Sequence, residues 1–401
     1  MRVLVIDYDF NIVNSASGQI ARVFWNQNNE LFHPLVLCAE GDDKNDNKCP
    51  VVKVKDQSII RHCLGLFREM GIPDFCHIPD QRRYSWMPFA LRKIRQILKR
   101  EHFDVIHSIS CPESSHLLAL QLHKEFGIPW VAQFNDPWIE NESKAFRFDR
   151  FHIIDKRMER QVAENADLII HSNRVIVNSW AKRYDNSVMK KIRIFPFSFN
   201  IPNLPELPGN YENSLPQGTL NIYHIGHLYG ARSAKTFFEG LCKLRNEMPN
   251  DFSKIRVNFI GSVSENDKRL VSEYNLSGNV HFLGVMPPDK LNAYYLKADI
   301  FLVIDMEVPE SPSFPSKLLL SHYYRRPIFC ITTKDSIIED DMKASGHSFC
   351  YYGEPDKVAS FLKQAVSDYS TLLDFDHEHW KDYTVENVTK LYQKELNELF
   401  I

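Results

Sequence analysis

Short apolar runs recur along the whole chain, each bounded by polar or turn-forming residues. Their length and their Val/Ile/Phe content are typical of strands buried on both faces. Between them lie segments with apolar residues at helical spacing, among them residues 19–26, 114–126 and 288–297. Strands that alternate with helices imply parallel sheets, so the pattern predicts the α/β fold class. The predicted strands are residues 2–7, 32–38, 103–110, 129–134, 167–172, 192–196, 220–226, 255–260, 280–284, 300–304 and 327–332.

One short helix between the last two of these strands is the best candidate for a ligand site. Pro315 suits a first helical turn, Ser313 offers an N-cap oxygen, and Pro327 ends the helix. The free N–H groups and the positive dipole end at such a helix start bind anions, phosphates above all. Lys317 adds a full charge in the first turn. The pattern therefore predicts a phosphate site, although most strand–helix units carry no ligand.

Polar residues also gather just after predicted strands in the first half of the chain. In open α/β sheets, ligands bind in the crevice beyond the carboxyl ends of the strands. Asp136 is a candidate for binding a ligand hydroxyl, and a turn or N-cap aspartate before Pro137 is the alternative. His107 is equally consistent with a site group and with a hydrogen-bonded core histidine. The polar residues are His107, Ser110, Asn135, Asp136 and Ser172.

The length of 401 residues and a Pro-rich stretch predict two domains. Residues 201–217 hold several prolines and asparagines and form the predicted linker. It separates a first domain, 1–200, from a second, 218–379. The tail, 380–401, has apolar residues on one side of a predicted helix.

Composition and charge narrow the functional classes. A formal net charge of −3 argues against a general nucleic-acid binder. The eight cysteines form no CxxC pair and no zinc-like spacing, so no metal site is predicted and a reducing compartment is favoured. No signal peptide and no membrane-spanning run is found, which favours the cytoplasm. The small-residue loop that ends at Gly18 lacks G-x-G-x-x-G, so hydride transfer has little support, but Gly18 is kept as a candidate ligand-binding glycine.

Residues 82–100 predict a basic amphipathic helix. Apolar positions such as Phe89 and Ile94 alternate with basic ones, and Trp86 leads the segment. Such a helix can lie on an anionic membrane surface. The alternative, which the fold favours, is a helix that covers the sheet and exposes a solvated basic face. The residues that motivate membrane contact are Arg82, Arg83, Trp86, Arg92, Lys93 and Arg95.

An ordered set of motifs over nearly the whole chain resembles family-4 glycosyltransferases, especially the branch that builds bacterial surface polysaccharides such as O-antigen or capsule. The resemblance implies the GT-B fold: two Rossmann-like domains that face a central cleft, with the C-terminal helix packed back on the first. It implies a nucleotide-sugar donor on the second domain, an acceptor on the first, and no metal or other cofactor. The matching motifs are Asp104–His107, Gly127–Trp130, Phe134–Trp138, Ala166–Ile170, Gly226–Arg232, Val280–Gly284, Ala298–Ile300 and Pro315–Leu318.

The resemblance assigns the donor site residue by residue. Gly226 matches the family glycine after the first strand of the second domain, and His227 and Arg232 take the two basic positions that hold the diphosphate. His227 is a departure, since histidine is only partly charged at neutral pH. Arg232 can bind phosphate with two parallel hydrogen bonds, and the alternative is a solvated surface arginine. The remaining donor positions are Gly284 and Val285 at the nucleotide base and Ser313, Ser316, Lys317 and Leu318 at the phosphates.

The same comparison exposes departures around the reacting sugar. Many family members carry two glutamates where this chain has Pro312 and Leu320, whose side chains accept no hydrogen bond. Glu310, with Glu307, is the candidate replacement for the first glutamate, and loop solvation is the alternative. A family histidine falls near Ile109, and His107 lies on the same face two residues earlier. Asp136, His107 and Glu310 are therefore the predicted catalytic residues.

Three functions are compatible with these features. The first is a glycosyltransferase that moves a sugar from a nucleoside diphosphate to a glycan or lipid-linked acceptor, with retention implied by the resemblance. The second is a non-catalytic GT-B protein that binds a partner transferase or a glycan, which the missing glutamates motivate. The third is another GT-B enzyme, such as a nucleotide-sugar epimerase.

Overall fold

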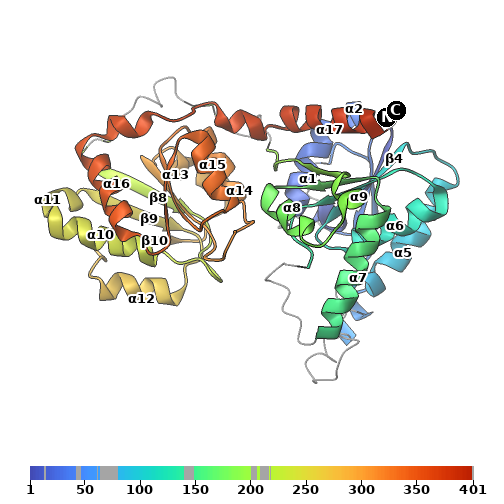
Figure 1. Cartoon of the computed structure of the whole chain (residues 1–401), viewed down its shortest axis with the longest axis horizontal. Helices are drawn as coiled ribbons and strands as arrows, with labels where there is room; N and C mark the ends of the chain where they lie inside the picture. The colour runs from blue at the N-terminus through green and yellow to red at the C-terminus, as the bar shows by residue number, and fades with distance from the viewer. Residues whose placement is uncertain are drawn as a thin grey trace. The chain divides into compact units, whose positions relative to one another are not determined.

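The computed structural model describes residues 1–12, 15–41, 47–60, 62–63, 80–139, 149–199, 206–207, 216 and 218–399. The chain forms two compact units (Figure 1). Unit 1 comprises Met1–Asn200 together with Thr384–Ile401, and unit 2 comprises Ile201–Tyr383. Most of the predicted linker 201–217 lies outside the described residues.

Unit 1 is built on one parallel sheet with the strand order β3-β2-β1-β4-β5-β6-β7. The order runs outward in both directions from the β1–β4 pair, so the chain reverses direction across the sheet between these two strands. Such a reversal is the topological switch point of a doubly wound fold. The strands are β1 (Val3–Ile6), β2 (Leu35–Ala39), β3 (Val51–Val54), β4 (Val105–Ser110), β5 (Trp130–Phe134), β6 (Leu168–His171) and β7 (Ile192–Ile194).

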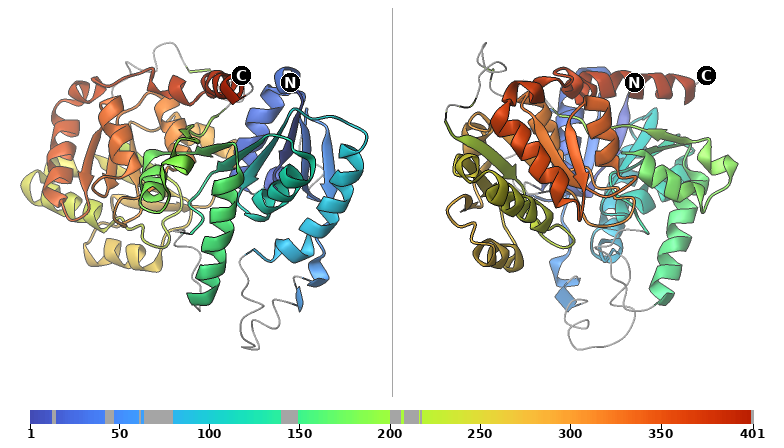
Figure 2. Two further views of the ribbon diagram at one scale, coloured as in Figure 1. Left: turned by 45° about the vertical axis from the view of Figure 1, so that its right-hand side comes forward. Right: turned by 60° about the vertical axis from the view of Figure 1, so that its left-hand side comes forward.

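Helices cover both faces of this sheet, because its strand residues point alternately to two separate cores. Leu4 and Ile6 belong to one core, and Val3 and Val5 belong to the other. Figure 2 shows the layers from two further directions. The helical elements of unit 1 are η1 (Tyr8–Asn11), α1 (Ala16–Gln27), α2 (Asn29–Phe32), α4 (Arg82–Ser85), α5 (Met87–Leu98), α6 (Ser114–Phe126), α7 (Asp149–Asn165), α8 (Arg174–Ala181), α9 (Asn186–Met189) and α17 (Val385–Leu399).

The C-terminal helix α17 completes the second core of unit 1. Tyr392 is buried among the rings of Trp25, Phe32 and Phe195. Its hydroxyl group lies 2.6 Å from Nδ1 of His107 on β4. The last segment of the chain therefore supplies core residues to the first domain, as the GT-B resemblance implies.

Unit 2 repeats the same architecture with the strand order β10-β9-β8-β11-β12-β13, all parallel. Its strands are β8 (Leu220–Ile225), β9 (Ile255–Ile260), β10 (Val280–Gly284), β11 (Ile300–Ile304), β12 (Ile328–Thr332) and β13 (Ser348–Tyr351). Its helices are α10 (Lys235–Glu247), α11 (Pro249–Phe252), α12 (Glu265–Glu273), α13 (Pro288–Tyr295), α14 (Ser316–Tyr323), α15 (Ile337–Ser345), α16 (Pro355–Ser367), η4 (Tyr369–Leu373) and η5 (His379–Tyr383). The predicted class, two doubly wound α/β domains, is thereby confirmed.

Three local predictions were wrong. The strand expected at 32–38 begins only at Leu35, because Phe32 ends the short helix α2 and its ring packs in the core. The tail is not one helix from 380, since η5 ends at Tyr383 and α17 begins at Val385. Ser313 does not cap α14, whose N-cap position is taken by Pro315.

Residues 82–98 form two helices, and their apolar side packs inward as the alternative interpretation expected. Trp86 is fully buried, with its ring edge-on to Tyr8, so it cannot anchor the chain in a membrane as predicted. Phe89, Arg92 and Lys93 remain exposed on α5. No helix in the described ranges combines the length and the apolar character needed to cross a bilayer.

Candidate donor site

The switch point of unit 2 holds a cavity of about 190 Å³. It lies between the ends of β8 and β11 and the start of α14, where a doubly wound sheet opens. Five of the predicted donor residues line it: Gly226, His227, Arg232, Lys317 and Leu318. Residues almost a hundred positions apart in the chain thus meet at one cavity.

Arg232 is held at the cavity by the loop that precedes α14. Its Nη2 donates a hydrogen bond of 2.8 Å to Oγ of Ser313, and its guanidinium lies 5.3 Å from the ring centre of Tyr229. The backbone N–H of Glu307 donates to the carbonyl of Ala231 over 2.8 Å, which fastens the same two loops together. Ser313 therefore positions Arg232.

The start of α14 leaves backbone donors available at the cavity. The first N–H groups of a helix have no partner within the helix, and Pro315 supplies no side-chain cap. Leu318 is an exception, because its N–H donates to the carbonyl of Pro315. Lys317 is partly buried, and this burial lowers the pKa of its ammonium group. An anion bound here would meet a full charge and the positive end of the helix dipole.

His227 contributes a neutral donor. Its Nδ1 accepts a hydrogen bond of 3.0 Å from the backbone N–H of Ser262. The neutral ring therefore carries its proton on Nε2. Partial burial, with the charge of Lys317, lowers the pKa of His227, so the neutral form is favoured at pH 7. His227 can thus donate one hydrogen bond to a phosphate oxygen without adding charge.

The sequence did not identify the residue that shapes the loop before α14. Asp305 is fully buried directly after β11. Its carboxylate accepts hydrogen bonds from the Ser311 hydroxyl at 2.9 Å and the Thr332 hydroxyl at 2.7 Å. The sequence signal that could have identified Asp305 is an aspartate directly after an apolar strand, because a buried acid must find hydrogen-bond partners.

Several predicted residues lie outside this cavity. Gly284 and Val285 are exposed at the end of β10, the outer strand of the sheet, and are not among its lining residues. Glu310 is exposed in a turn with a left-handed φ of 48°, and neither it nor Glu307 lines the cavity. Ser316 is the first residue of α14.

The carboxyl edge of the first sheet carries the predicted acceptor residues. Asp136 is exposed there, directly after β5. Its neighbour Asn135 is buried, donates to the Ser17 hydroxyl at 2.7 Å and accepts from the Gln133 amide at 3.0 Å. Asn135 therefore joins β5 to the start of α1 and holds the turn that presents Asp136.

His107 is engaged in the core of unit 1. It is 1% exposed, and its Nε2 lies 2.9 Å from Oε1 of Gln133 while Nδ1 faces the Tyr392 hydroxyl. Burial lowers the pKa of His107 to about 4, so it is neutral at pH 7. This geometry favours the core interpretation, because both ring nitrogens already have protein partners.

Gly18 and Asp7 lie at the same edge of the first sheet. Close packing accounts for the glycine at position 18, and Asp7 is a buried acid. A Cβ atom on Gly18 would come within 2.1 Å of the Asp9 carbonyl oxygen, and the Gly18 N–H already donates to Ser15 Oγ. Asp7, at the end of β1, is fully buried, and this burial raises the pKa of its carboxyl to about 8.

Comparison with known proteins agrees with this arrangement. Residues 35–197 match the family model described as Glycosyltransferase Family 4. No curated protein matches the sequence significantly. Solved structures match over the whole chain at low sequence identity, which shows a shared fold.

Three of these structures cover both units. Anabaena HepE, solved in complex with UDP, is 12% identical with a TM-score of 0.70, covering 99% of this chain and 100% of that one. Sucrose-phosphate synthase from Thermosynechococcus elongatus is 14% identical with a TM-score of 0.67, covering 100% and 99%. The lipopolysaccharide outer core galactosyltransferase WaaB is 14% identical with a TM-score of 0.63, covering 99% of both chains.

The two doubly wound units and the returning C-terminal helix form the GT-B fold. Within this class, residues 35–197 resemble glycosyltransferase family 4.

Proposed function

We propose that the protein transfers a sugar from a nucleoside-diphosphate sugar, bound in unit 2, to a hydroxyl group of a glycan or lipid-linked acceptor in surface-polysaccharide synthesis. The observation that carries the proposal is the convergence of Arg232, Lys317 and the start of α14 on one cavity at the switch point. This donor set matches a diphosphate in charge and in hydrogen-bonding capacity. The likeness to WaaB supports a polysaccharide acceptor.

The proposed chemistry is electrostatic. The bond between the anomeric carbon and the phosphate oxygen breaks, and the nucleoside diphosphate leaves with an extra negative charge. Arg232, Lys317 and the free N–H groups of α14 stabilise that charge, which lowers the barrier. The acceptor hydroxyl attacks the anomeric carbon and gives up its proton to an oxygen of the departing diphosphate. Asp136 is the proposed acceptor-side residue, because its exposed carboxylate stands at the carboxyl edge of the first sheet.

Donor binding can be tested with a thermal-shift panel of UDP-, GDP-, ADP- and dTDP-sugars on the whole chain. A ligand that binds only the folded protein stabilises it, by about 2.7 kcal/mol at a ligand concentration one hundred times the Kd. This added stability raises the melting temperature. UDP and UDP-glucose come first in the panel, since HepE has been solved with both. A higher melting temperature with one class of nucleotide sugar supports the proposal, whereas an unchanged melting temperature with all of them contradicts it.

A second candidate is a non-catalytic relative that binds a nucleotide sugar or a glycan without turnover. Pro312 and Leu320 favour it, because neither side chain can hold a sugar or ribose hydroxyl. Release of free sugar from the bound donor separates the two, since a transferase hydrolyses its donor slowly when no acceptor is present. Conversion of the donor sugar into an epimer would instead indicate an epimerase-like enzyme.

A lipid-linked acceptor would place the enzyme at the cytoplasmic surface of a membrane. Phe89 is 42% exposed on α5, and the basic residues Arg92 and Lys93 lie beside it on the exposed side. An apolar ring flanked by cations suits an anionic interface. We infer that the membrane-contacting surface consists of Phe89, Arg92 and Lys93 on α5 together with Lys99 and Arg100, which directly follow the helix.

Liposome flotation tests this surface. Binding should require anionic lipid and weaken with salt, with each basic residue contributing roughly 1 kcal/mol. The double variant Arg92→Glu/Lys93→Glu should lose flotation. The control, Lys268→Glu/Arg269→Glu, reverses an exposed basic pair on α12 and should float normally. Equal flotation of both variants would show that α5 is not the contact.

A further inference from the structure

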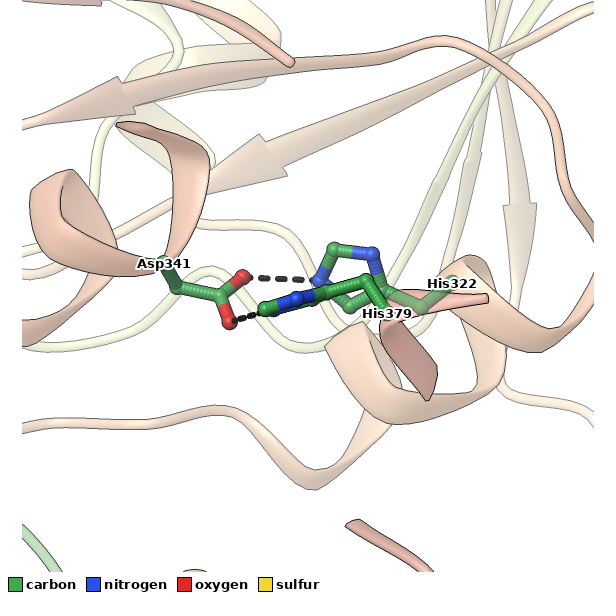
Figure 3. Close-up of side chains that lie close together, drawn as sticks. All are labelled: His322, Asp341 and His379. Atoms are coloured by element: carbon green, nitrogen blue, oxygen red, sulfur yellow. Dashed lines mark hydrogen bonds and ion pairs between the residues drawn. The ribbon is translucent and has the colours of Figure 1, made fainter. Parts of the chain in front are cut away.

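The helix that begins at the donor cavity ends in a buried polar cluster. His322, in the last turn of α14, meets Asp341 on α15 and His379 on η5 (Figure 3). The three side chains are between 1% and 9% exposed. Nε2 of His322 lies 2.7 Å from Oδ2 of Asp341, and Nε2 of His379 lies 2.9 Å from Oδ1. One carboxylate thus joins three separate elements of unit 2.

A fourth residue connects the cluster to the loop before α14. The Tyr383 hydroxyl also donates to Oδ1 of Asp341. The Tyr383 ring stacks on Phe314, with ring centres 5.5 Å apart and planes 27° apart. Phe314 lies directly between Ser313, which holds Arg232, and Pro315, which precedes α14. Asp341 therefore contacts the donor helix at its far end through His322 and the donor loop through Tyr383.

The distances favour a hydrogen-bonded cluster over a metal centre, although the three residue types could ligate an ion. Two ligand atoms that share one zinc ion, each about 2.0–2.1 Å from it in tetrahedral geometry, lie about 3.4 Å apart. The separations of 2.7 and 2.9 Å are those of charge-assisted hydrogen bonds. A metal-bound histidine also donates its other ring N–H to an acceptor, whereas Nδ1 of His322 is buried without a partner among the described residues.

The cluster is electrostatically strong. Burial alone would raise the pKa of Asp341, but the charge of His322 and the three donors outweigh it and lower that pKa. The hydrogen bond and charge of Asp341 likewise raise the pKa of His379 against the effect of burial. A buried carboxylate that stays ionised must keep its partners, so removing it should release all three elements together.

We propose that Asp341 is a positioning residue for donor binding. It fixes α14 through His322 and fixes the loop before α14 through Tyr383. Lys317, the helix N–H groups and Arg232, which Ser313 holds, can then converge on the diphosphate. The inference rests on the proposed function and adds a residue remote from the cavity to the donor site. Asp341 does not line the cavity and acts only through the elements that it holds.

The test uses Asp341→Asn in the whole chain, with Asp356→Asn as the matched control. Asp356 is an acid on α16 whose side chain is 82% exposed. The first readout needs no ligand: amide hydrogen exchange should accelerate in residues 313–323 of Asp341→Asn and stay at the wild-type rate in the control. The second readout is the Kd for UDP, which should rise by about tenfold in Asp341→Asn, because small misplacements of binding groups are costly. The melting temperature, measured alongside, separates lost positioning from lost folding.

Tyr383 supplies a second, conservative test if Asp341→Asn does not fold. Tyr383→Phe keeps the ring that stacks on Phe314 but removes the hydroxyl that donates to Asp341, so it should accelerate exchange in 313–323. Tyr383→Ala removes the ring and should accelerate exchange there and weaken UDP binding.

Three results would overturn the inference. They are unchanged exchange in 313–323 of Asp341→Asn or Tyr383→Ala, an unchanged Kd in a folded Asp341→Asn variant, and one equivalent of zinc retained by the purified wild type. Failure of the wild type to bind UDP, GDP, ADP or dTDP would instead defeat the proposed function, while the exchange rates would still decide whether Asp341 holds α14 and its loop.

Discussion

Arg232 and Lys317 each bring a positive charge to a cavity from which water is partly excluded. Burial of a cation is unfavourable, as the lowered pKa of Lys317 reflects. No ion pair between either side chain and a carboxylate is found among the described residues, although the charge of Arg232 acts on the buried Asp305 carboxylate. The proposed diphosphate would bring further negative charge to the two cations.

Removal of either cation should therefore weaken donor binding. Arg232→Ala and Lys317→Ala should each raise the Kd for the nucleoside diphosphate by about tenfold or more, since charge-assisted hydrogen bonds contribute roughly 1.5–3 kcal/mol. Titration calorimetry measures the change. Lys235→Ala is the control, because Lys235 is an exposed lysine at the start of α10 whose ion-pair partner is Glu239 on the same helix. If both variants bind as the wild type does, the site assignment is wrong.

At the residue scale, the sequence predicted the residues that local strand and helix ends bring to the cavity. It did not predict side-chain environments that depend on residues distant in the chain. Gly226, His227, Arg232 and Lys317 follow predicted strands or open a predicted helix, and they meet at one cavity. His107 also lies in a predicted strand, but its environment is set by Tyr392, 285 positions later in the chain. Nothing within the strand indicates that partner.

Helix packing in unit 2 depends on one glycine. A Cβ atom on Gly240 of α10 would lie 2.4 Å from Cβ of Val358 on α16. The backbone carbonyl of Pro355 would lie 3.0 Å away. Contacts under 3.0 Å force one helix to move, so the absent side chain is what lets α10 and α16 approach each other.

Gly240→Ala should lower the stability of the chain by about 1–3 kcal/mol, the usual range for overpacking. The helix propensity of alanine opposes this by roughly 1 kcal/mol, which makes the sign of the result informative. Urea unfolding followed by circular dichroism measures it. Gly278→Ala is the control, because a Cβ atom there meets no atom within 4 Å. A Gly240→Ala variant as stable as the wild type would show that the two helices adjust freely.

At the element scale, the apolar pattern predicted strand bounds well but did not predict where a helix is interrupted. The strands β9, β10 and β11 begin and end where the sequence placed them. The strand β11 is a continuous apolar run, whereas β9 and β10 are mainly apolar runs that contain single polar residues. The tail was predicted as one helix, since its apolar stripe is continuous in the sequence. The break at Thr384 follows from tertiary structure: Tyr383 is fixed by Asp341 in unit 2, and the next residue pairs with Phe199 in unit 1.

At the scale of the whole molecule, the chain passes from unit 1 to unit 2 and back. Unit 1 is completed only when α17 places Tyr392 and Leu396 in its core. Local patterns predicted the two parallel sheets, because α/β alternation fixes the fold class. The donor sugar and the acceptor could not be predicted, because they depend on side-chain positions around the reacting group, where Pro312 and Leu320 depart from the family pattern.

The central claim is that the switch-point cavity of unit 2 holds the diphosphate of a nucleotide sugar. The most direct measurement is a crystal structure of the whole chain with the nucleoside diphosphate that gives the largest thermal shift. The account predicts phosphate oxygens within hydrogen-bond distance of the Arg232 guanidinium and the first N–H groups of α14. A nucleotide bound elsewhere, such as the larger hollow beside Phe103 and Pro129 at the opposite edge of the first sheet, would contradict it.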